Sequence, residues 1–177
     1  MVSPVRALKA TATLIATTLV LAACERADNA DSSPGLNAAT RAAVTEGVRQ
    51  LARDSAHGVT REGPAAWHRY FSPAPAFFMA SEGQLVFSSA STATRGIDDL
   101  THLIKSIELR WGDDLRVDPL TADLAVMGSS WSELRVGADG ARVTEGGYFT
   151  AVAERRDGRW MFRNAHWSVM PASPKAP

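Results

Sequence analysis

The chain has 177 residues, 45% of them hydrophobic, and its 19 basic and 19 acidic side chains give no net charge. This balance offers no basic footprint for nucleic acid, so we expect no nucleic-acid partner. The one cysteine and the four histidines lack the spacing of metal ligands, so we expect no disulfide, no bound metal and no other cofactor.

Residues 1–23 have the layout of a secretory signal peptide. Arg6 and Lys9 form a short basic region, and the apolar run that follows is too short to cross a bilayer as a helix. The run ends in "LAAC", which resembles the lipobox of bacterial lipoproteins. This resemblance implies that Cys24 is acylated and becomes the first residue of the mature chain.

An acylated Cys24 predicts an address in the cell envelope. The chain from Cys24 onward keeps 17 basic and 19 acidic residues, a net charge of −2. We expect a lipoprotein that is anchored in the membrane and faces the periplasm. In such lipoproteins an aspartate directly after the cysteine is associated with retention in the inner membrane, but here Glu25 has that position. The resemblance therefore implies the outer membrane if the cell has two membranes.

Composition separates one domain from its flanks. Residues 24–36 contain almost no apolar side chain larger than alanine and are predicted to be a flexible tether. The last segment, "PASPKAP" over 171–177, is predicted to be a disordered tail. Residues 37–170 between them are enough for a single domain that buries a sizeable core.

Three helices are predicted in the first part of this domain. Apolar residues recur at helical spacing over 37–55 and again over 97–107, and the shorter segment 64–71 has a proline in its first turn. Between the segments 64–71 and 97–107, residues 76–89 are typical of two short strands around Glu82-Gly83. The helices are therefore predicted to precede or flank a small hairpin.

From residue 109 the apolar period changes to two, which predicts long antiparallel strands. Residues 123–136 form one of them, with a bulge expected at 128–130, and residues 142–156 form the next. The dipeptide Asp157-Gly158 favours a tight turn into the last strand. The order of elements indicates an α+β domain in which helices cover one face of a curved antiparallel sheet.

Two segments resemble a known superfamily. The closing hairpin, "YFTAVAERRDGRWMFRNAHWS", and the segment "ATRGIDDL" resemble the nuclear transport factor 2-like superfamily, and within it the SnoaL-like group. The resemblance covers residues 37–170 and implies a sheet curled into a cone, with three helices packed on its concave face around a cavity. It leaves the activity open, because the superfamily contains isomerases, cyclases, dehydratases, transport adaptors and assembly domains.

The last strand supplies the candidate ligand contacts. With a two-residue turn at Asp157-Gly158, His166 is expected opposite Phe149 and on the concave face. A histidine hydrogen-bonded within the core remains the alternative. We expect the pocket to be lined by polar groups of the last strand and by aromatic groups around them: His166, Asn164, Ser168, Phe149, Trp131, Trp67 and Tyr70.

The same parity places apolar side chains on the opposite face of the sheet. The helices can cover only one face, so a second cover is needed, and the superfamily's sheet-to-sheet dimers imply a second copy of the chain. The predicted dimer interface consists of Tyr148, Val152, Met161 and Trp167.

Three functions remain open at this point. The favoured one is an envelope protein that binds a small, largely apolar molecule in the cone. The second is an acid–base enzyme of the isomerase or cyclase type that uses His166. Glu133 is the nearest carboxylate, because it lies two residues beyond Trp131 and shares its face if no bulge intervenes. The third is a non-catalytic dimeric assembly domain with a filled cone. Because the last strand offers a histidine and no carboxylate, we expect a binding protein rather than an enzyme.

Overall fold

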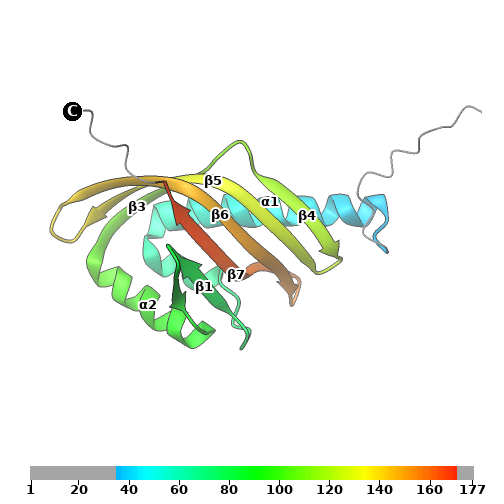
Figure 1. Ribbon diagram of the computed structural model, residues 1–177, viewed down its shortest axis with the longest axis horizontal. Coiled ribbons are helices and arrows are strands. Elements are labelled where there is room, and N and C mark those ends of the chain that lie inside the picture. Colours follow the sequence, from blue (N-terminus) through cyan, green and yellow to red (C-terminus); the bar gives the residue numbers. More distant parts are fainter. Residues whose placement is uncertain (1–34, 171–177) are drawn as a thin grey trace, which may run out of the picture. The chain divides into compact units, whose positions relative to one another are not determined.

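The computed structural model describes residues 35–170, so the predicted signal peptide, the predicted acylation site Cys24 and the predicted tail 171–177 lie outside the described residues. The predicted α+β class is confirmed (Figure 1). In chain order the elements are α1 (Ala38–Glu62), the 3-10 helix η1 (Pro64–Arg69), β1 (Phe78–Ser81), β2 (Gln84–Phe87), α2 (Ala90–Leu103), β3 (Ile104–Trp111), β4 (Arg116–Thr121), β5 (Leu124–Gly137), β6 (Arg142–Arg156) and β7 (Arg159–Val169).

Each helix begins and ends at a local signal. The side chain of Asn37 accepts a hydrogen bond from the Thr40 amide (2.8 Å) and caps α1, which continues to Gly63, where φ is +75°. This helix is longer than predicted: it continues through Gly58, which is buried against the Tyr70 side chain. The segment after it forms a 3-10 helix, and α2 starts at the Ser89 capping box.

The third predicted helix was placed too far along the chain. α2 ends at Leu103, and Ile104 already has extended dihedrals (φ −120°, ψ 118°) as the first residue of β3. The spacing of Ile104 and Ile107 fitted a helix, yet both side chains reach the cavity from a strand. No helix within residues 35–170 is long and apolar enough to span a membrane.

Seven strands form one curved sheet in the order β2-β1-β7-β6-β5-β3, with β4 also paired to β5. All pairs are antiparallel except one: β1 lies parallel to β7, so the sheet is mixed rather than wholly antiparallel. α1 and α2 lie on the same side of this sheet (Figure 1). The arrangement is the cone of sheet and helices that the resemblance implied.

The turn between β6 and β7 follows the prediction, but the register beyond it does not. Asp157 (φ +51°) and Gly158 (φ +77°) make a two-residue turn, and Ala153 pairs with Phe162 as expected. A bulge at Arg163 then shifts the pairing by one residue, so that Val152 pairs with Asn164. The bulge was predicted in β5, at 128–130, where the pairing with β6 is in fact regular.

The bulge coincides with a change of neighbour along the edge of β7. Before it, Phe162 exchanges backbone hydrogen bonds with Tyr70 (2.7 Å) and Ser72 (2.8 Å); after it, β1 pairs from Asn164 onward. The Arg163 side chain contacts the carboxylate of Glu154 (3.1 Å). From this point every side chain of β7 lies on the opposite face from the one predicted.

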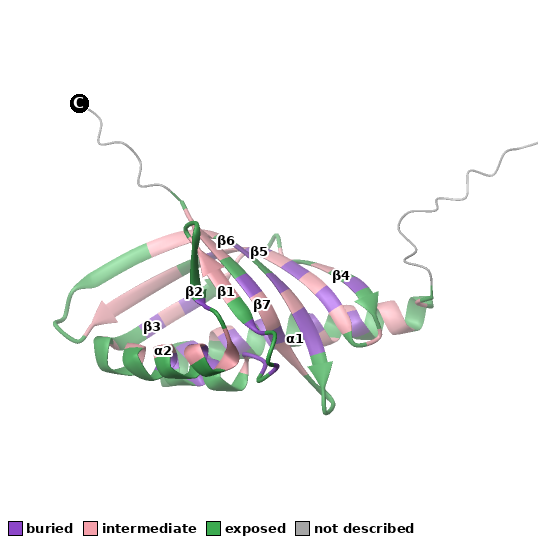
Figure 2. Cartoon of the chain, turned by 60° about the horizontal axis from the view of Figure 1, so that its bottom comes forward, coloured by how far each residue is buried: buried purple, intermediate pink, exposed green. Residues whose placement is uncertain are grey.

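The core lies between α1 and the concave face of the sheet (Figure 2). Val48 and Val59 of α1 and Phe149 and Phe162 of the sheet are fully buried there. Trp160 packs against α1 at Gly47, where a side chain would collide with the indole ring. Since α1 and the strands fill this part of the cone with side chains, the space that remains lies toward α2.

Candidate functional site

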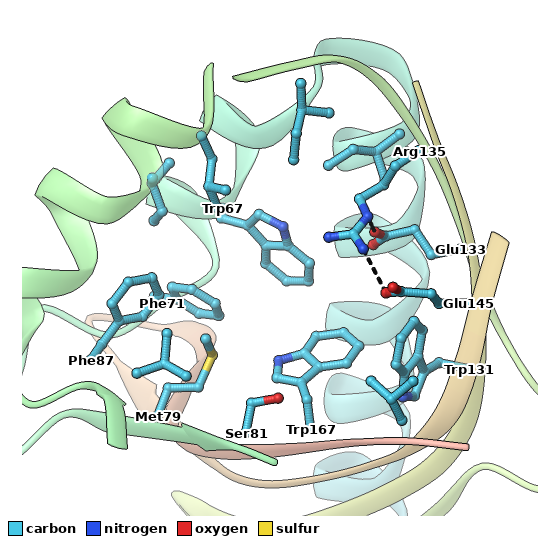
Figure 3. Close-up of a pocket in the computed structure, with 16 residues that line it drawn as sticks. Trp67, Phe71, Met79, Ser81, Phe87, Trp131, Glu133, Arg135, Glu145 and Trp167 are labelled. Carbon is cyan, nitrogen blue, oxygen red and sulfur yellow. Dashed lines mark hydrogen bonds and ion pairs between the residues drawn. The ribbon is translucent and has the colours of Figure 1, made fainter. Parts of the chain in front are cut away.

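A cavity of about 270 Å³ lies between the concave face of the sheet, η1 and α2 (Figure 3). Apolar side chains form most of its wall, and the β1–β2 hairpin closes one side of it. The lining residues are Trp67, Phe71, Met79, Ser81, Val86, Phe87, Ile97, Leu100, Ile104, Ile107, Trp131, Glu133, Arg135, Glu145, Trp167 and Val169. The cone is therefore not filled by its own side chains.

Trp167 is the centre of an aromatic cluster in this wall. Its ring lies edge-on to Trp67 (centroids 6.0 Å apart) and to Trp131 (5.0 Å), and it contacts Phe149 at 4.4 Å and Trp111 at 5.7 Å. Such edge-to-face and tilted pairs are favourable geometries for aromatic rings. The cluster exists because the bulge at Arg163 turns Trp167 inward.

Three charged side chains come together at another part of the wall. Glu133 of β5 pairs directly with Glu145 of β6, which would place two carboxylates opposite each other. Arg135 shares their face and lies between them: its Nε is 3.1 Å from Glu133 and its Nη2 is 2.6 Å from Glu145 (Figure 3). The arginine thus relieves the repulsion between the two acids.

Glu133 is the most deeply placed of the three. Its side chain is only 13% exposed, against 34% for Arg135 and 32% for Glu145. Burial raises the pKa of Glu133, the nearby Arg135 lowers it in part, and Glu145 raises it again. The carboxyl group therefore holds a proton more readily than an exposed glutamate does.

The structure brings three of the predicted site residues to the cavity. Trp67 and Trp131 line it, and so does Glu133, which alternation had placed on the face of Trp131. Phe149 is fully buried in the core, where it contacts Trp167 and Phe162, and it is not among the lining residues. Tyr70 lies away from the cavity, and its hydroxyl donates to the Asp54 carbonyl oxygen (2.7 Å).

The polar cluster predicted on β7 lies on the other face of the sheet. His166 pairs with Thr150, not with Phe149, and it is exposed. The Asn164 amide donates to the Ala76 carbonyl oxygen (3.1 Å), and the Ser168 hydroxyl donates to that of Tyr148 (3.0 Å). The predicted placement of these three residues in the cone is wrong, because the bulge reverses the faces of β7.

The same bulge divides the four residues predicted to share the outer face. Tyr148, which is 41% exposed, and Val152 alternate with the buried Phe149 and lie on the outer face as expected. Met161 is partly exposed and lines a separate surface hollow. Trp167 was placed on the wrong face and belongs to the cavity wall.

Sequence reasoning missed several lining residues for different reasons. Arg135 follows Trp131 and Glu133 at two-residue spacing, so alternation alone could have placed it on the cavity face. Glu145 required the pairing of β5 with β6, and Trp167 required the bulge. In the part of the chain that the structure describes, no three His, Cys, Asp or Glu side chains lie close enough to hold a metal ion.

Comparison with solved structures shows which fold this is. A nuclear transport factor 2-like protein from Salmonella enterica superimposes with a TM-score of 0.58 at 14% identity, over 77% of this chain and 95% of that one. A conserved protein from Planctomyces limnophilus gives 0.61 at 13% identity, over 75% and 100%. This chain has the nuclear transport factor 2-like fold.

At least one protein that shares the nuclear transport factor 2-like fold is named as an enzyme. The hexachlorocyclohexane dehydrochlorinase LinA-type3 from Novosphingobium barchaimii superimposes with a TM-score of 0.59 at 16% identity, over 77% of this chain and 95% of that one. No family model matches the sequence, and no curated protein matches it. The likeness establishes the fold, while the activity has to be argued from the site.

Proposed function

We propose that this chain is a cell-envelope protein whose cone binds a small, largely apolar molecule. The observation that carries the proposal is the cavity of about 270 Å³, whose wall is apolar except for Ser81, Glu133, Arg135 and Glu145. Pockets for small molecules are typically concave, mainly apolar and supplied with a few polar groups. An unfilled cone also argues against a purely structural assembly domain.

A cavity-filling variant tests this proposal. Val169 lines the cavity, whereas Val136, also on a long strand, lies on the outer face. Titration with the neutral dye N-phenyl-1-naphthylamine should show saturable binding to the unaltered protein and to Val136→Trp, but not to Val169→Trp. If the unaltered protein shows no saturable binding, or if both variants bind alike, the cavity is not the binding site.

We further propose that the chain is anchored through an acylated Cys24 and faces the periplasm. The support is the "LAAC" sequence after a short apolar run. Two or more acyl chains give stable attachment, at about 0.8 kcal/mol for each buried methylene. Cys24→Ser should abolish labelling with a palmitate analogue and shift the protein from the membrane to the soluble fraction or leave the precursor uncleaved. A variant that still labels and sediments like the parent contradicts the anchor.

A homodimer through the outer face of the sheet remains part of the proposal. Tyr148 and Val152 support it, because they expose apolar surface on a face that neither α1 nor α2 covers. Trp167 no longer contributes to this surface. The outer face is also more polar than the sequence indicated, since the bulge places Asn164, His166 and Ser168 there.

Proton transfer by Glu133 is a second candidate function. One observation favours it: a carboxyl group whose pKa burial raises lies in the wall of an apolar cavity. His166, the base expected from the sequence, does not line this cavity. If the protein turns over a bound molecule, Glu133→Gln should abolish turnover while the molecule still binds. Turnover that survives the substitution removes Glu133 from this role.

A further inference from the structure

Two indole N–H groups in the cavity wall, those of Trp67 and Trp167, have no acceptor within residues 35–170, and Trp67 is the more deeply buried of the two. Trp67 is 7% exposed, stacks on Phe71 (5.0 Å) and lines the cavity, yet its indole N–H has no hydrogen-bond partner within residues 35–170. Figure 3 shows its nitrogen facing the cavity on the side of Arg135. This nitrogen is not among the polar atoms sealed inside the protein, so a bound molecule can reach it.

Two of the other indole groups have the partner that a buried tryptophan normally finds, whereas the partly exposed Trp160 and Trp167 have none within residues 35–170. Trp111 donates to the Ala52 carbonyl oxygen (2.8 Å), and Trp131, which also lines the cavity, donates to that of Ser168 (3.3 Å). Buried donors in proteins nearly always have such partners. The unpartnered N–H of Trp67 is therefore a position where a ligand can supply the missing acceptor.

The charged residues of the wall restrict what the ligand can be. With both carboxylates ionised, Glu133, Arg135 and Glu145 carry a net charge of −1, and among the described residues 35–170 they are the only charged side chains that line the cavity. Arg135 places Nε and Nη2 on the two carboxylates, so its positive charge is already balanced by them and only part of its donor set remains for an incoming group. An anionic ligand would meet like charge in an apolar surrounding, where repulsion is weakly screened.

We propose that the cavity selects neutral molecules that carry a hydrogen-bond acceptor, such as a ketone oxygen, on an apolar body, and that the indole N–H of Trp67 holds this acceptor. The inference rests on the proposed binding function and names its ligand class. An organic cation would suit the aromatic wall but would leave the Trp67 donor unpaired. A hydrocarbon would fill the cavity but would likewise leave the Trp67 donor without an acceptor.

Four probes of similar shape separate these classes: acetophenone, ethylbenzene, benzoate and 1-phenylethylammonium. The protein is the chain from Glu25 onward, which keeps the whole core, because every core residue lies between Val44 and Ala165. Affinity and the indole N–H signals are followed together by NMR titration. Acetophenone should bind about tenfold more tightly than ethylbenzene, and benzoate should bind most weakly. Only acetophenone should shift the Trp67 signal strongly downfield.

Two matched variants assign the effect to one N–H group. Trp67→Phe should reduce acetophenone affinity about tenfold, to the level of ethylbenzene, and leave ethylbenzene binding unchanged. Trp131→Phe removes an indole from the same wall whose N–H is already used, so it should keep the preference for acetophenone. Ethylbenzene binding also reports whether each variant keeps the cavity.

The outcomes separate this inference from the function on which it rests. If no probe binds, both fail. If ethylbenzene or the ammonium compound binds as well as acetophenone, the cavity binds small molecules but the ligand class is wrong. If Trp67→Phe keeps the preference for acetophenone, Trp67 is not the donor that holds the acceptor, and that part of the proposal is wrong. Glu133→Gln removes one negative charge and should increase benzoate affinity; an unchanged affinity would show that the charged residues do not exclude anions.

Discussion

The contact between α1 and β7 predicts the effect of adding one methyl group. A Cβ atom at Gly47 would lie 2.3 Å from Nε1 and 2.7 Å from Cδ1 of Trp160, whereas ordinary contacts lie at 3.4–4 Å. The indole ring is rigid, and the Arg155 guanidinium lies over it at 6.0 Å from the ring centre. Gly47→Ala therefore forces the helix or the ring to move by about 1 Å.

Two opposing contributions set the magnitude. Alanine in a helix interior is more stable than glycine by about 1 kcal/mol, while overpacking a fitted contact costs about 1–3 kcal/mol. Gly47→Ala should thus lower the free energy of unfolding by up to about 2 kcal/mol. In a Trp160→Ala background the collision is absent, so the same substitution should raise the free energy of unfolding by about 1 kcal/mol.

Urea unfolding of the four proteins in this cycle, followed by circular dichroism, measures both effects. The change of sign is the decisive result, because helix propensity alone gives the same stabilisation in both backgrounds. If Gly47→Ala stabilises the chain equally with and without the Trp160 ring, then α1 does not pack against β7 at this point. The part of the cone behind the cavity would then be assigned incorrectly.

Three further predictions follow from the site. Burial raises the pKa of Glu133 in the folded protein above the ordinary value of 4.5. The stability that this group contributes is therefore fully present below pH 4.5 and is lost as the pH rises through the folded pKa. Glu133→Gln should therefore raise the free energy of unfolding at neutral pH and change it little near pH 4; the same gain at both pH values would exclude an ionisation effect. His166→Ala should leave ligand affinity and stability within about 0.5 kcal/mol of the unaltered protein, and a larger loss of affinity would return this residue to the pocket. Tyr148→Glu should convert a dimer to a monomer in light scattering, whereas Leu103→Glu, at a 63% exposed position of α2, should not; a monomeric unaltered protein at micromolar concentration refutes the dimer.

Local signals in the sequence determined most of the framework. The asparagine before α1, the turn at Asp157-Gly158 and the two-residue alternation of β5 each act through neighbours a few residues away. For this reason the helices on one side of a curved sheet were predicted, and Trp131 and Glu133 were placed together on the cavity face. These features need no knowledge of what lies across the sheet.

The faces of β7 were decided only by the tertiary structure. The single extra residue at Arg163 lies where the edge partner of β7 changes from the segment around Tyr70 and Ser72 to β1, some 90 positions earlier in the chain. Because side chains alternate along a strand, one inserted residue exchanges His166 for Trp167 in the cavity. The pairing of Glu145 with Glu133 likewise arises between strands. A period of two within a strand carries no information about such partners, so the chemistry of the cavity followed from the assembled sheet.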